Sequence, residues 1–460
     1  MKITTPIRDF VVSYTERSPL RLHMPGHKGV LLTGHEHDDI TEVTGADSLY
    51  EASGIIGESE ANASLLFGCP TYYSTEGSSQ CIRAMLHLAN LWSKREHPHG
   101  RFKVLAGRNA HKTFLSAVAL LDVDVVWLTP AEGSSYLSCP ITADDVERAL
   151  DADEGISAVY LTSPDYLGHT LPIADISKVC HTRGVKLLVD NAHGAYLKFL
   201  PESKHPMDQG ADLCCDSAHK TLPVLTGGAY LHISEDAPSV CTNMAKQALS
   251  LFGSTSPSYL ILRSLDMANA YLSDGYAEKL YSLIGEVAAL RGRLSEHGFT
   301  LVGDEPIKLT LLTKPYGYRG QEMATLLEKE GIVCEFADPD FLVFMLTPEV
   351  GTDGLARLEA ALVNLPRRDA IAQCPPPVAT PERVLSVREA MLSPAEVLDV
   401  KSCVGRVLGA ATVGCPPAVP IVVSGERINE DAVACFAYYG IKTCMVVRED
   451  ATQQKRTDAP

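Results

Sequence analysis

Short apolar runs alternate with amphipathic stretches through the middle of the chain. Five runs rich in Val and Leu predict buried strands, at residues 103–106, 124–128, 157–161, 185–189 and 212–215. Helical spacing of apolar residues covers residues 110–121, 142–150 and 173–183, and Gly184 stands where a helix stop is expected. Strands that alternate with helices predict a mainly parallel sheet covered on both faces, with ligands beyond the carboxyl ends of the strands.

The remaining pattern predicts smaller parts after this sheet. Residues 258–297 are almost continuously helical, shorter β/α alternation follows them, and five prolines between residues 365 and 381 indicate a linker. We therefore expect an N-terminal segment and a large domain over residues 1–258 and a bridging helix with a small α/β lobe over 259–364. A linker over 365–381 and a C-terminal α+β module over 382–460 complete the prediction.

Composition narrows the classes of function. The 460 residues include 40 Lys and Arg against 57 Asp and Glu, which gives a net charge of −17. This acidity argues against a nucleic-acid or anionic-membrane partner and is compatible with a small cationic substrate, although it also simply favours solubility. Thirteen cysteines without paired spacing predict reduced thiols and no metal site. With no signal-like N-terminus and no run of about 18 apolar residues, we expect a soluble cytoplasmic protein.

Two strand ends carry the most informative chemistry. Lys220 follows the predicted strand at 212–215, where a partly desolvated amine can form a Schiff base, although Lys220 taken alone could be an ordinary surface lysine. Asp190 ends an otherwise apolar strand, and His193 follows it. A carboxylate there needs a cationic partner such as a protonated pyridine nitrogen, or it caps the next helix. The order of Asp190 and Lys220 favours a pyridoxal cofactor.

Two further segments could complete a cofactor site. Gly77, Ser78 and Ser79 precede a helical run, and hydroxyls at a helix N-terminus bind phosphate, although the same residues describe any capped loop. His111 follows a strand and could stack on an aromatic ring, or it could be a helix-capping or core histidine. The basic segment at residues 21–29 could contact a carboxylate or phosphate, or be a solvated loop.

Taken together, these motifs resemble the Orn/Lys/Arg decarboxylase family of pyridoxal-phosphate enzymes, in its short form. The resemblance is carried by six ordered blocks: HMPGHK at 23–28, RNAHK at 108–112, SPDYLG at 163–168, DNAHGA at 190–195, SAHKTLP at 217–223 and STSPSY at 254–259. Residues 416–420 and 424–426 resemble the family's C-terminal module. The resemblance implies the aspartate-aminotransferase-like fold (fold type I) for the large domain.

The resemblance also implies a role for each matching residue. Lys220 would bind pyridoxal 5'-phosphate covalently, Asp190 would pair with its ring nitrogen, and His111 would stack on the ring with His193 nearby. Lys220 or His219 would return a proton to the substrate. The phosphate would be held by Gly77, Ser78, Ser79, Ser217 and His219. Ser254 and Thr255 would approach the phosphate of a partner subunit, because such active sites lie at the interface of a homodimer or higher assembly.

Several positions depart from the family pattern. Glu76 stands where Asn is usual, Cys81 replaces Gly, Asp165 replaces Thr and Asn191 replaces Glu. A proline expected near Ser53 is absent, and the Tyr-Pro-Pro-Gly signature reads CPPA at 415–418. None of these changes removes Lys220, Asp190 or His111, so the cofactor is predicted more firmly than the substrate.

The expected function is decarboxylation of arginine, lysine or ornithine to a polyamine-type amine and carbon dioxide. Glu76, Asp47 and Asp165 are candidate carboxylates for the distal ammonium or guanidinium of such a substrate. Two alternatives stay open at this point: a pyridoxal-phosphate enzyme of another reaction type, such as aminotransfer or elimination, and a homologue that binds the cofactor without catalysis.

Overall fold

The structure, a computed structural model, describes residues 3–130, 133–377, 381–410 and 417–449. It divides into two compact units. The first comprises Met1–Phe102, Ser157–Ser163 and Ile173–Tyr281, and the second comprises Lys103–Ile156, Pro164–Pro172 and Ser282–Pro460. The predicted four-part division of the chain stays a prediction. Of the family-like C-terminal motif, Cys415 and Pro416 lie outside the described residues.

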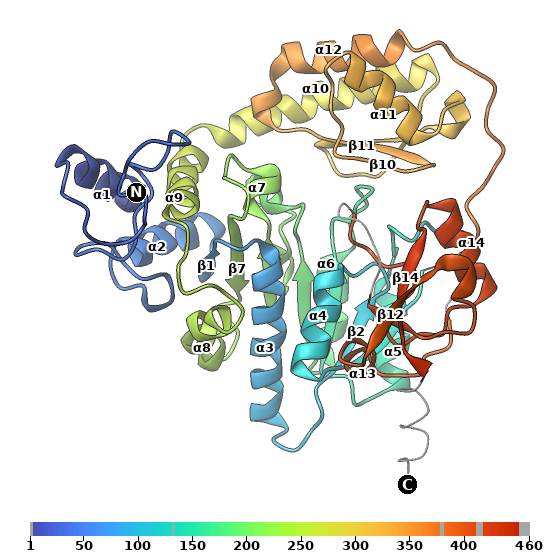
Figure 1. Ribbon diagram of the computed structural model, residues 1–460, viewed down its shortest axis with the longest axis horizontal. Helices are drawn as coiled ribbons and strands as arrows, with labels where there is room; N and C mark the ends of the chain where they lie inside the picture. Colours follow the sequence, from blue (N-terminus) through green and yellow to red (C-terminus); the bar gives the residue numbers. More distant parts are fainter. Residues whose placement is uncertain (1–2, 131–132, 378–380, 411–416, 450–460) are drawn as a thin grey trace. The chain divides into compact units, whose positions relative to one another are not determined.

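A sheet forms the centre of the first unit (Figure 1). Its strands lie in the order β1-β7-β6-β5-β4; Figure 1 labels β1 and β7. The neighbours β4 and β5 are parallel, as are β5 and β6, whereas β7 is antiparallel to both β6 and β1. The bounds of these strands are β1 (Thr71–Ser74), β4 (Ala158–Thr162), β5 (Lys186–Asp190), β6 (Leu213–Asp216) and β7 (Ala229–Ile233).

Burial explains why the parallel strands were visible in the sequence. Every residue of β5, with the sequence KLLVD, is buried, as continuous apolar runs in parallel sheets are. The helix before β5 ends at Thr182, and Gly184 takes a positive φ of 68° that favours glycine, so the predicted stop is confirmed. Helix α3 packs against β1, β5, β6 and β7.

The α-helices of the first unit are α1 (Pro6–Glu16), α2 (Ile55–Phe67), α3 (Ser78–Glu96), α6 (Ile173–Thr182), α7 (Ala218–Thr221), α8 (Ser239–Ser250) and α9 (Tyr259–Ser273). Of these, α3, α6 and α9 lie where the periodicity predicted helices. The predicted helical stretch at 258–297 is two helices, because a break at residues 274–275 separates α9 from α10 (Tyr276–His297), which continues into the second unit.

The second unit contains a parallel pair and two small antiparallel sheets. The pair is β2 (Lys103–Gly107) with β3 (Asp124–Leu128). One sheet has the order β10-β11-β9-β8, with β8 (Thr300–Val302), β9 (Lys308–Leu312), β10 (Phe336–Ala337) and β11 (Phe341–Met345). The other has the order β12-β14-β13, with β12 (Ala395–Asp399), β13 (Leu408–Ala410) and β14 (Thr443–Val447).

The second unit also holds the other longer helices. They are α4 (Lys112–Leu121), α5 (Ala143–Ala152), α11 (Gly320–Lys329), α12 (Gly351–Val363), α13 (Val387–Met391) and α14 (Glu430–Tyr438). Within the predicted linker, residues 365–377 form no helix or strand. The twelve described cysteines are all free thiols. No helix among the described residues is long and apolar enough to span a membrane.

Candidate active site

Lys220 lies where the first unit's sheet ends in a short helix (Figure 1). Strand β6 ends at Asp216, Ser217 precedes α7, and Lys220 is the third residue of that helix. The Nζ atom of Lys220 is 2.9 Å from Nε2 of His193, and His193 is buried just beyond the end of β5. The structure thus brings together two of the predicted site residues from the carboxyl ends of two neighbouring parallel strands.

Asp190, the last residue of β5, is a buried carboxylate whose Oδ1 also accepts from the Cys215 thiol over 3.8 Å. Its side chain is 1 % exposed. It accepts hydrogen bonds from the Tyr160 hydroxyl at 3.0 Å and from the Ala192 N–H at 3.3 Å. Burial raises the pKa of Asp190, and the charge of Lys220 offsets this rise only in part. A carboxylate in this setting is stabilised by a cation that donates a hydrogen bond.

Hydroxyl groups gather at the N-terminus of α3, a helix of 19 residues. Ser78 and Ser79 are its first two residues, and Ser217 Oγ donates to Ser78 Oγ over 2.8 Å. Gly77 precedes them with a φ of 72°, and its N–H donates to the Gly227 carbonyl over 2.7 Å. The first N–H groups of a helix lack partners within it, so this end offers backbone and hydroxyl donors to an anion.

Gly227 and Gly228 allow the backbone of their loop to lie close to the residues that precede α3. At Gly227, with φ +100°, a Cβ would lie 2.8 Å from the Thr75 carbonyl oxygen. The ring of His219 is held by the neighbouring Gly228, whose carbonyl is 3.0 Å from His219 Nδ1. The Gly-Gly pair therefore fixes the loop that faces Ser78 and His219.

The donors and acceptors of the first unit fit pyridoxal phosphate. An amine at Lys220 suits the aldehyde, and the buried carboxylate of Asp190 suits a cationic ring nitrogen. The helix end at Ser78 with Ser217 suits a phosphate dianion. These three chemistries occur on elements that neighbouring strands of one sheet and the contact between Ser217 and Ser78 hold together, so the residues present match the parts of the cofactor.

Two other predicted residues have clear local contacts. His111 belongs to the second unit, where it caps α4 by accepting the Thr113 N–H on Nδ1 at 3.1 Å. This contact is the helix-capping alternative, and ring stacking by His111 stays a prediction. Thr255 is exposed, and the N–H of the adjacent Ser254 donates to the Glu76 carboxylate of the same chain.

The three candidate carboxylates differ in how fully they are occupied. Asp47 accepts hydrogen bonds from the backbone N–H groups of five residues between 48 and 57, so its carboxylate holds the start of α2. Asp165 is buried and bonded to the N–H groups of Leu167 and His169 and to the His169 ring. Glu76 is exposed beside the α3 N-terminus. The hydrogen bonds from backbone N–H groups to Asp47 and to Asp165 could not be predicted from the sequence.

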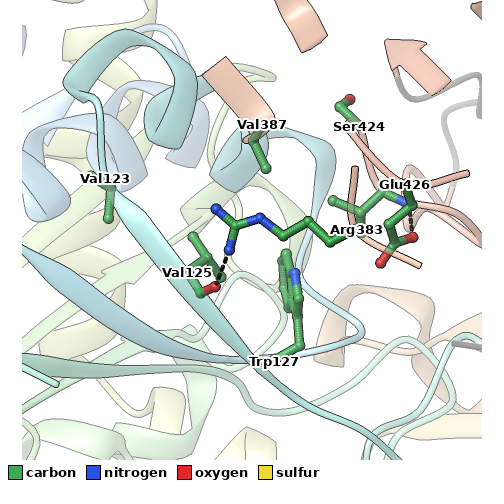
Figure 2. A pocket seen from close by; sticks show the side chains of 8 residues that line it. Val123, Val125, Trp127, Arg383, Val387, Ser424 and Glu426 are labelled. Carbon is green, nitrogen blue, oxygen red and sulfur yellow. Dashed lines mark hydrogen bonds between the residues drawn. The ribbon is translucent and has the colours of Figure 1, made fainter. Parts of the chain in front are cut away.

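A small pocket in the second unit involves none of the predicted site residues. Figure 2 shows Arg383 extending across it, with its guanidinium donating to the Val125 carbonyl over 3.2 Å. The pocket is lined by Val123, Val125, Trp127, Arg383, Val387, Val423, Ser424 and Glu426. The pocket is lined mainly by apolar side chains, and its charged groups are bonded to other parts of the chain: Arg383 to the Val125 carbonyl and Glu426 to Arg108. It therefore differs from the site around Lys220.

Comparison with known proteins decides the family. Residues 5–297 match the model of the Orn/Lys/Arg decarboxylase major domain. The chain belongs to the Orn/Lys/Arg decarboxylase family. An arginine decarboxylase of Halalkalibacterium halodurans is 28% identical over 464 residues, which cover 94% of this chain and 92% of that protein. An arginine decarboxylase of Bacillus subtilis is 26% identical over the same shares, 94% and 92%.

Solved structures agree with this decarboxylase family on the fold. The lysine decarboxylase of Francisella novicida superposes with a TM-score of 0.77 at 17% identity, covering 97% of this chain and 81% of that chain. The constitutive lysine decarboxylase of Escherichia coli gives 0.75 at 19% identity, with 97% and 82% covered. The predicted family, fold type I and pyridoxal phosphate are confirmed: the chain is a pyridoxal-phosphate-dependent decarboxylase of this family.

Proposed function

We propose that this decarboxylase acts on a basic amino acid, with arginine the first substrate to test, and forms carbon dioxide and a polyamine-type amine. The contact between Lys220 Nζ and His193 Nε2, at 2.9 Å beside the buried Asp190, carries the proposal. Arginine is placed first because the arginine decarboxylases of two bacilli align along almost the whole chain. Lysine and ornithine are the other members of the family's substrate class.

We assign the cofactor contacts as follows. Lys220 binds the aldehyde carbon, Asp190 accepts a hydrogen bond from the ring nitrogen, and the donors around the α3 N-terminus hold the phosphate. These donors are Gly77, Ser78, Ser79, Ser217 and His219. When bound, the cofactor supplies a cationic ring that accepts the electron pair released as carbon dioxide leaves. His111 stacking on that ring and Thr255 approaching a partner's phosphate remain part of the proposal.

After carbon dioxide has left, a group of the chain itself must donate a proton to the substrate carbon. Lys220 Nζ and His193 Nε2 lie 2.9 Å apart, a hydrogen-bond distance over which a free Lys220 amine and the His193 ring can share a proton. His219 Nδ1, in contrast, faces a backbone carbonyl at 3.0 Å and is therefore a fixed donor there. This difference favours Lys220, assisted by His193, over His219 as the acid that returns a proton to the substrate carbon.

Exposure favours Glu76 as the carboxylate that meets the distal cation of the substrate. All three carboxylates accept hydrogen bonds from backbone N–H groups, Glu76 from that of Ser254, but Asp47 and Asp165 are buried whereas Glu76 is exposed beside the proposed phosphate site. Glu76→Gln should raise KM for arginine by about two- to fivefold, because an exposed ion pair contributes roughly 0.5–1 kcal/mol, with a smaller effect on kcat. An unchanged KM would remove Glu76 from this role.

A homodimer or higher assembly is favoured by an apolar surface near the N-terminus. Six large apolar side chains between residues 20 and 32 are 58–84% exposed: Leu20, Leu22, Met24, Val30, Leu31 and Leu32. Such a concentration of exposed apolar side chains is typical of an interface. We propose that a second copy of the chain covers this surface, and that the protein is located in the cytoplasm. In sedimentation velocity, the double variant Leu22→Lys, Leu32→Lys should therefore shift the protein toward the monomer.

The experiment that tests the function is carbon dioxide release by the purified enzyme with pyridoxal phosphate and arginine, lysine or ornithine in turn. Release from one of them would establish reaction and substrate, and Lys220→Ala should abolish both release and the visible absorbance of the bound cofactor. Formation of a keto acid without carbon dioxide would instead identify aminotransfer. A Lys220→Ala protein that keeps both properties would refute the assignment of Lys220.

A further inference from the structure

A fully buried polar cluster lies within the first unit's sheet, on the face opposite the Asp190 side chain. It consists of His205, Asp216 and His232, each with a side chain that is 0% exposed. Asp216 Oδ2 is 3.0 Å from His205 Nε2 and 3.1 Å from His232 Nε2. The Phe67 ring covers both histidines, with ring centroids 5.6 and 4.7 Å apart. We call these three residues the His–Asp–His cluster.

Hydrogen bonds extend the cluster across four neighbouring strands. Thr71 on β1 pairs with His232 on β7, and its Oγ1 is 2.9 Å from His232 Nδ1. On the other side, Asn191 Nδ2 donates to Asp216 Oδ1 over 2.7 Å. Asn191 is the first residue after β5, and its N–H donates to the Cys215 carbonyl, so it stands opposite Asp216 on β6. The chain of contacts therefore runs from β1 to the end of β5.

The directions of these hydrogen bonds assign the protons. The Thr71 hydroxyl donates to the Cys69 carbonyl over 3.0 Å, so it accepts from His232 Nδ1, whose ring also donates from Nε2 to Asp216. His232 is thus an imidazolium paired with a carboxylate. Burial alone would lower the pKa of His232, but the Asp216 charge and hydrogen bond outweigh burial and raise it. The two histidines lower the pKa of Asp216 despite burial.

The same contacts argue against a metal ion, although the three ligand atoms lie within 4.8 Å of one another. His205 Nδ1 accepts the Met207 N–H, so the neutral ring carries its proton on Nε2, the atom that faces Asp216. His232 carries protons on both nitrogens. Both rings therefore present a proton to Asp216, and a metal ion could bind here only by displacing both protons.

We propose that Asp216 is a positioning residue that fixes the ends of β5 and β6 to one another, and so keeps Asp190 and Ser217 in place for the cofactor. Asp216 directly precedes Ser217, and Asn191 directly follows Asp190. Neighbouring residues of a strand point to opposite faces of the sheet. Asn191 and Asp216 therefore lie on the face opposite the Asp190 side chain, and their hydrogen bond holds the backbone of both strand ends from that face. The inference rests on the proposed roles of Asp190 and Ser217.

The carboxylate is essential to this link because it accepts from Asn191 and from both histidines at once, while the Cys214 thiol donates to its Oδ1 over 3.8 Å. In Asp216→Asn, the NH2 group of the new side chain would lie opposite an N–H donor, so one hydrogen bond would be lost. The buried imidazolium of His232 would also lose the negative charge that stabilises it. Asn191→Ala is the milder variant, since it removes only the side-chain contact between the strand ends, keeps the backbone hydrogen bond to the Cys215 carbonyl and leaves the His–Asp–His cluster intact. Both variants should therefore loosen the cofactor contacts, and Asn191→Ala should do so with less loss of stability.

The test measures cofactor binding and its geometry in the full-length protein. Cofactor-free Asp216→Asn and Asn191→Ala proteins should bind pyridoxal phosphate about 10- to 100-fold more weakly, the range typical of outer contacts that orient a site. The visible circular dichroism of the bound cofactor, at saturation, should also change. Asp266→Asn is the matched control, because Asp266 is an equally buried carboxylate of this unit that bonds to Ser59 and Arg8 instead.

Each outcome decides the inference. Wild-type affinity and dichroism in Asn191→Ala would overturn it, even where Asp216→Asn fails to fold. Stoichiometric zinc in the purified protein that is lost in Asp216→Asn would also overturn it in favour of a metal site. If Asp190→Asn and Ser217→Ala keep wild-type affinity, the proposed cofactor contacts fail; if they weaken binding while Asn191→Ala does not, the positioning inference alone fails.

Discussion

The Ser217 hydroxyl allows a quantitative test of the proposed phosphate site. Its Oγ donates to Ser78 Oγ over 2.8 Å at the N-terminus of α3. A hydrogen bond to a charged group contributes about 1.5–3 kcal/mol, and each 1.4 kcal/mol changes Kd by a factor of about ten. Ser217→Ala and Ser78→Ala should therefore each raise the Kd of pyridoxal phosphate roughly 10- to 100-fold. Because the two hydroxyls contact each other, the double variant should lose less than the sum.

Equilibrium dialysis of cofactor-free protein against pyridoxal phosphate is the assay. Ser93→Ala is the control, since Ser93 is also a buried serine of α3 but lies near its other end. Thermal unfolding of the cofactor-free variants checks that each one folds. A Ser217→Ala protein with the same Kd as Ser93→Ala would refute the placement of the phosphate, and strict additivity in the double variant would refute the shared site.

Three further predictions concern stability. Glu426→Gln should cost about 3–5 kcal/mol in denaturant unfolding, because it leaves buried Arg108 without the carboxylate 2.7 Å away; a loss below about 1 kcal/mol would contradict this. Burial raises the pKa of Asp266 to about 6, so its contribution to stability falls as pH rises from about 4 through 6. The stability difference from Asp266→Asn should shrink over that range, and a growing difference would reverse the sign. The raised pKa of Asp190 likewise predicts that Asp190→Asn stabilises the cofactor-free protein more at high pH than at low pH, as parallel denaturation curves would reveal.

The parallel part of the fold could be predicted because each of its strands is a continuous apolar run. Strands β1 and β7 were missed for the opposite reason. The sequence TYYS of β1 is short and rich in hydroxyls, and β7, AYLHI, carries a histidine. Both are antiparallel to their neighbours and become strands only through pairing across more than 150 residues of chain. Strand β10, with only two residues, likewise becomes a strand only through its pairing with β11.

The candidate site also has parts that the sequence predicts and parts that only the folded structure reveals. The juxtaposition of Lys220 with His193 and Asp190 follows from the rule that parallel strands place their carboxyl ends at one edge. The occupation of Asp47 by five backbone N–H groups depends on a loop conformation, which residue types alone do not reveal. His205 and His232 stand 11 and 16 residues from Asp216, at spacings that belong to no motif, so only the folded sheet brings them together.

The buried carboxylate of Asp190 has a consequence for the life of the protein in the cell. The charge of Lys220 offsets the burial of this group only in part, so Asp190 makes the cofactor-free chain less stable at neutral pH, and a ligand that binds only the folded state stabilises that state by mass action. Newly made chains in a cell short of the cofactor would therefore spend more time unfolded and be degraded sooner. The amount of folded enzyme, as well as its occupancy, would then follow the supply of the cofactor.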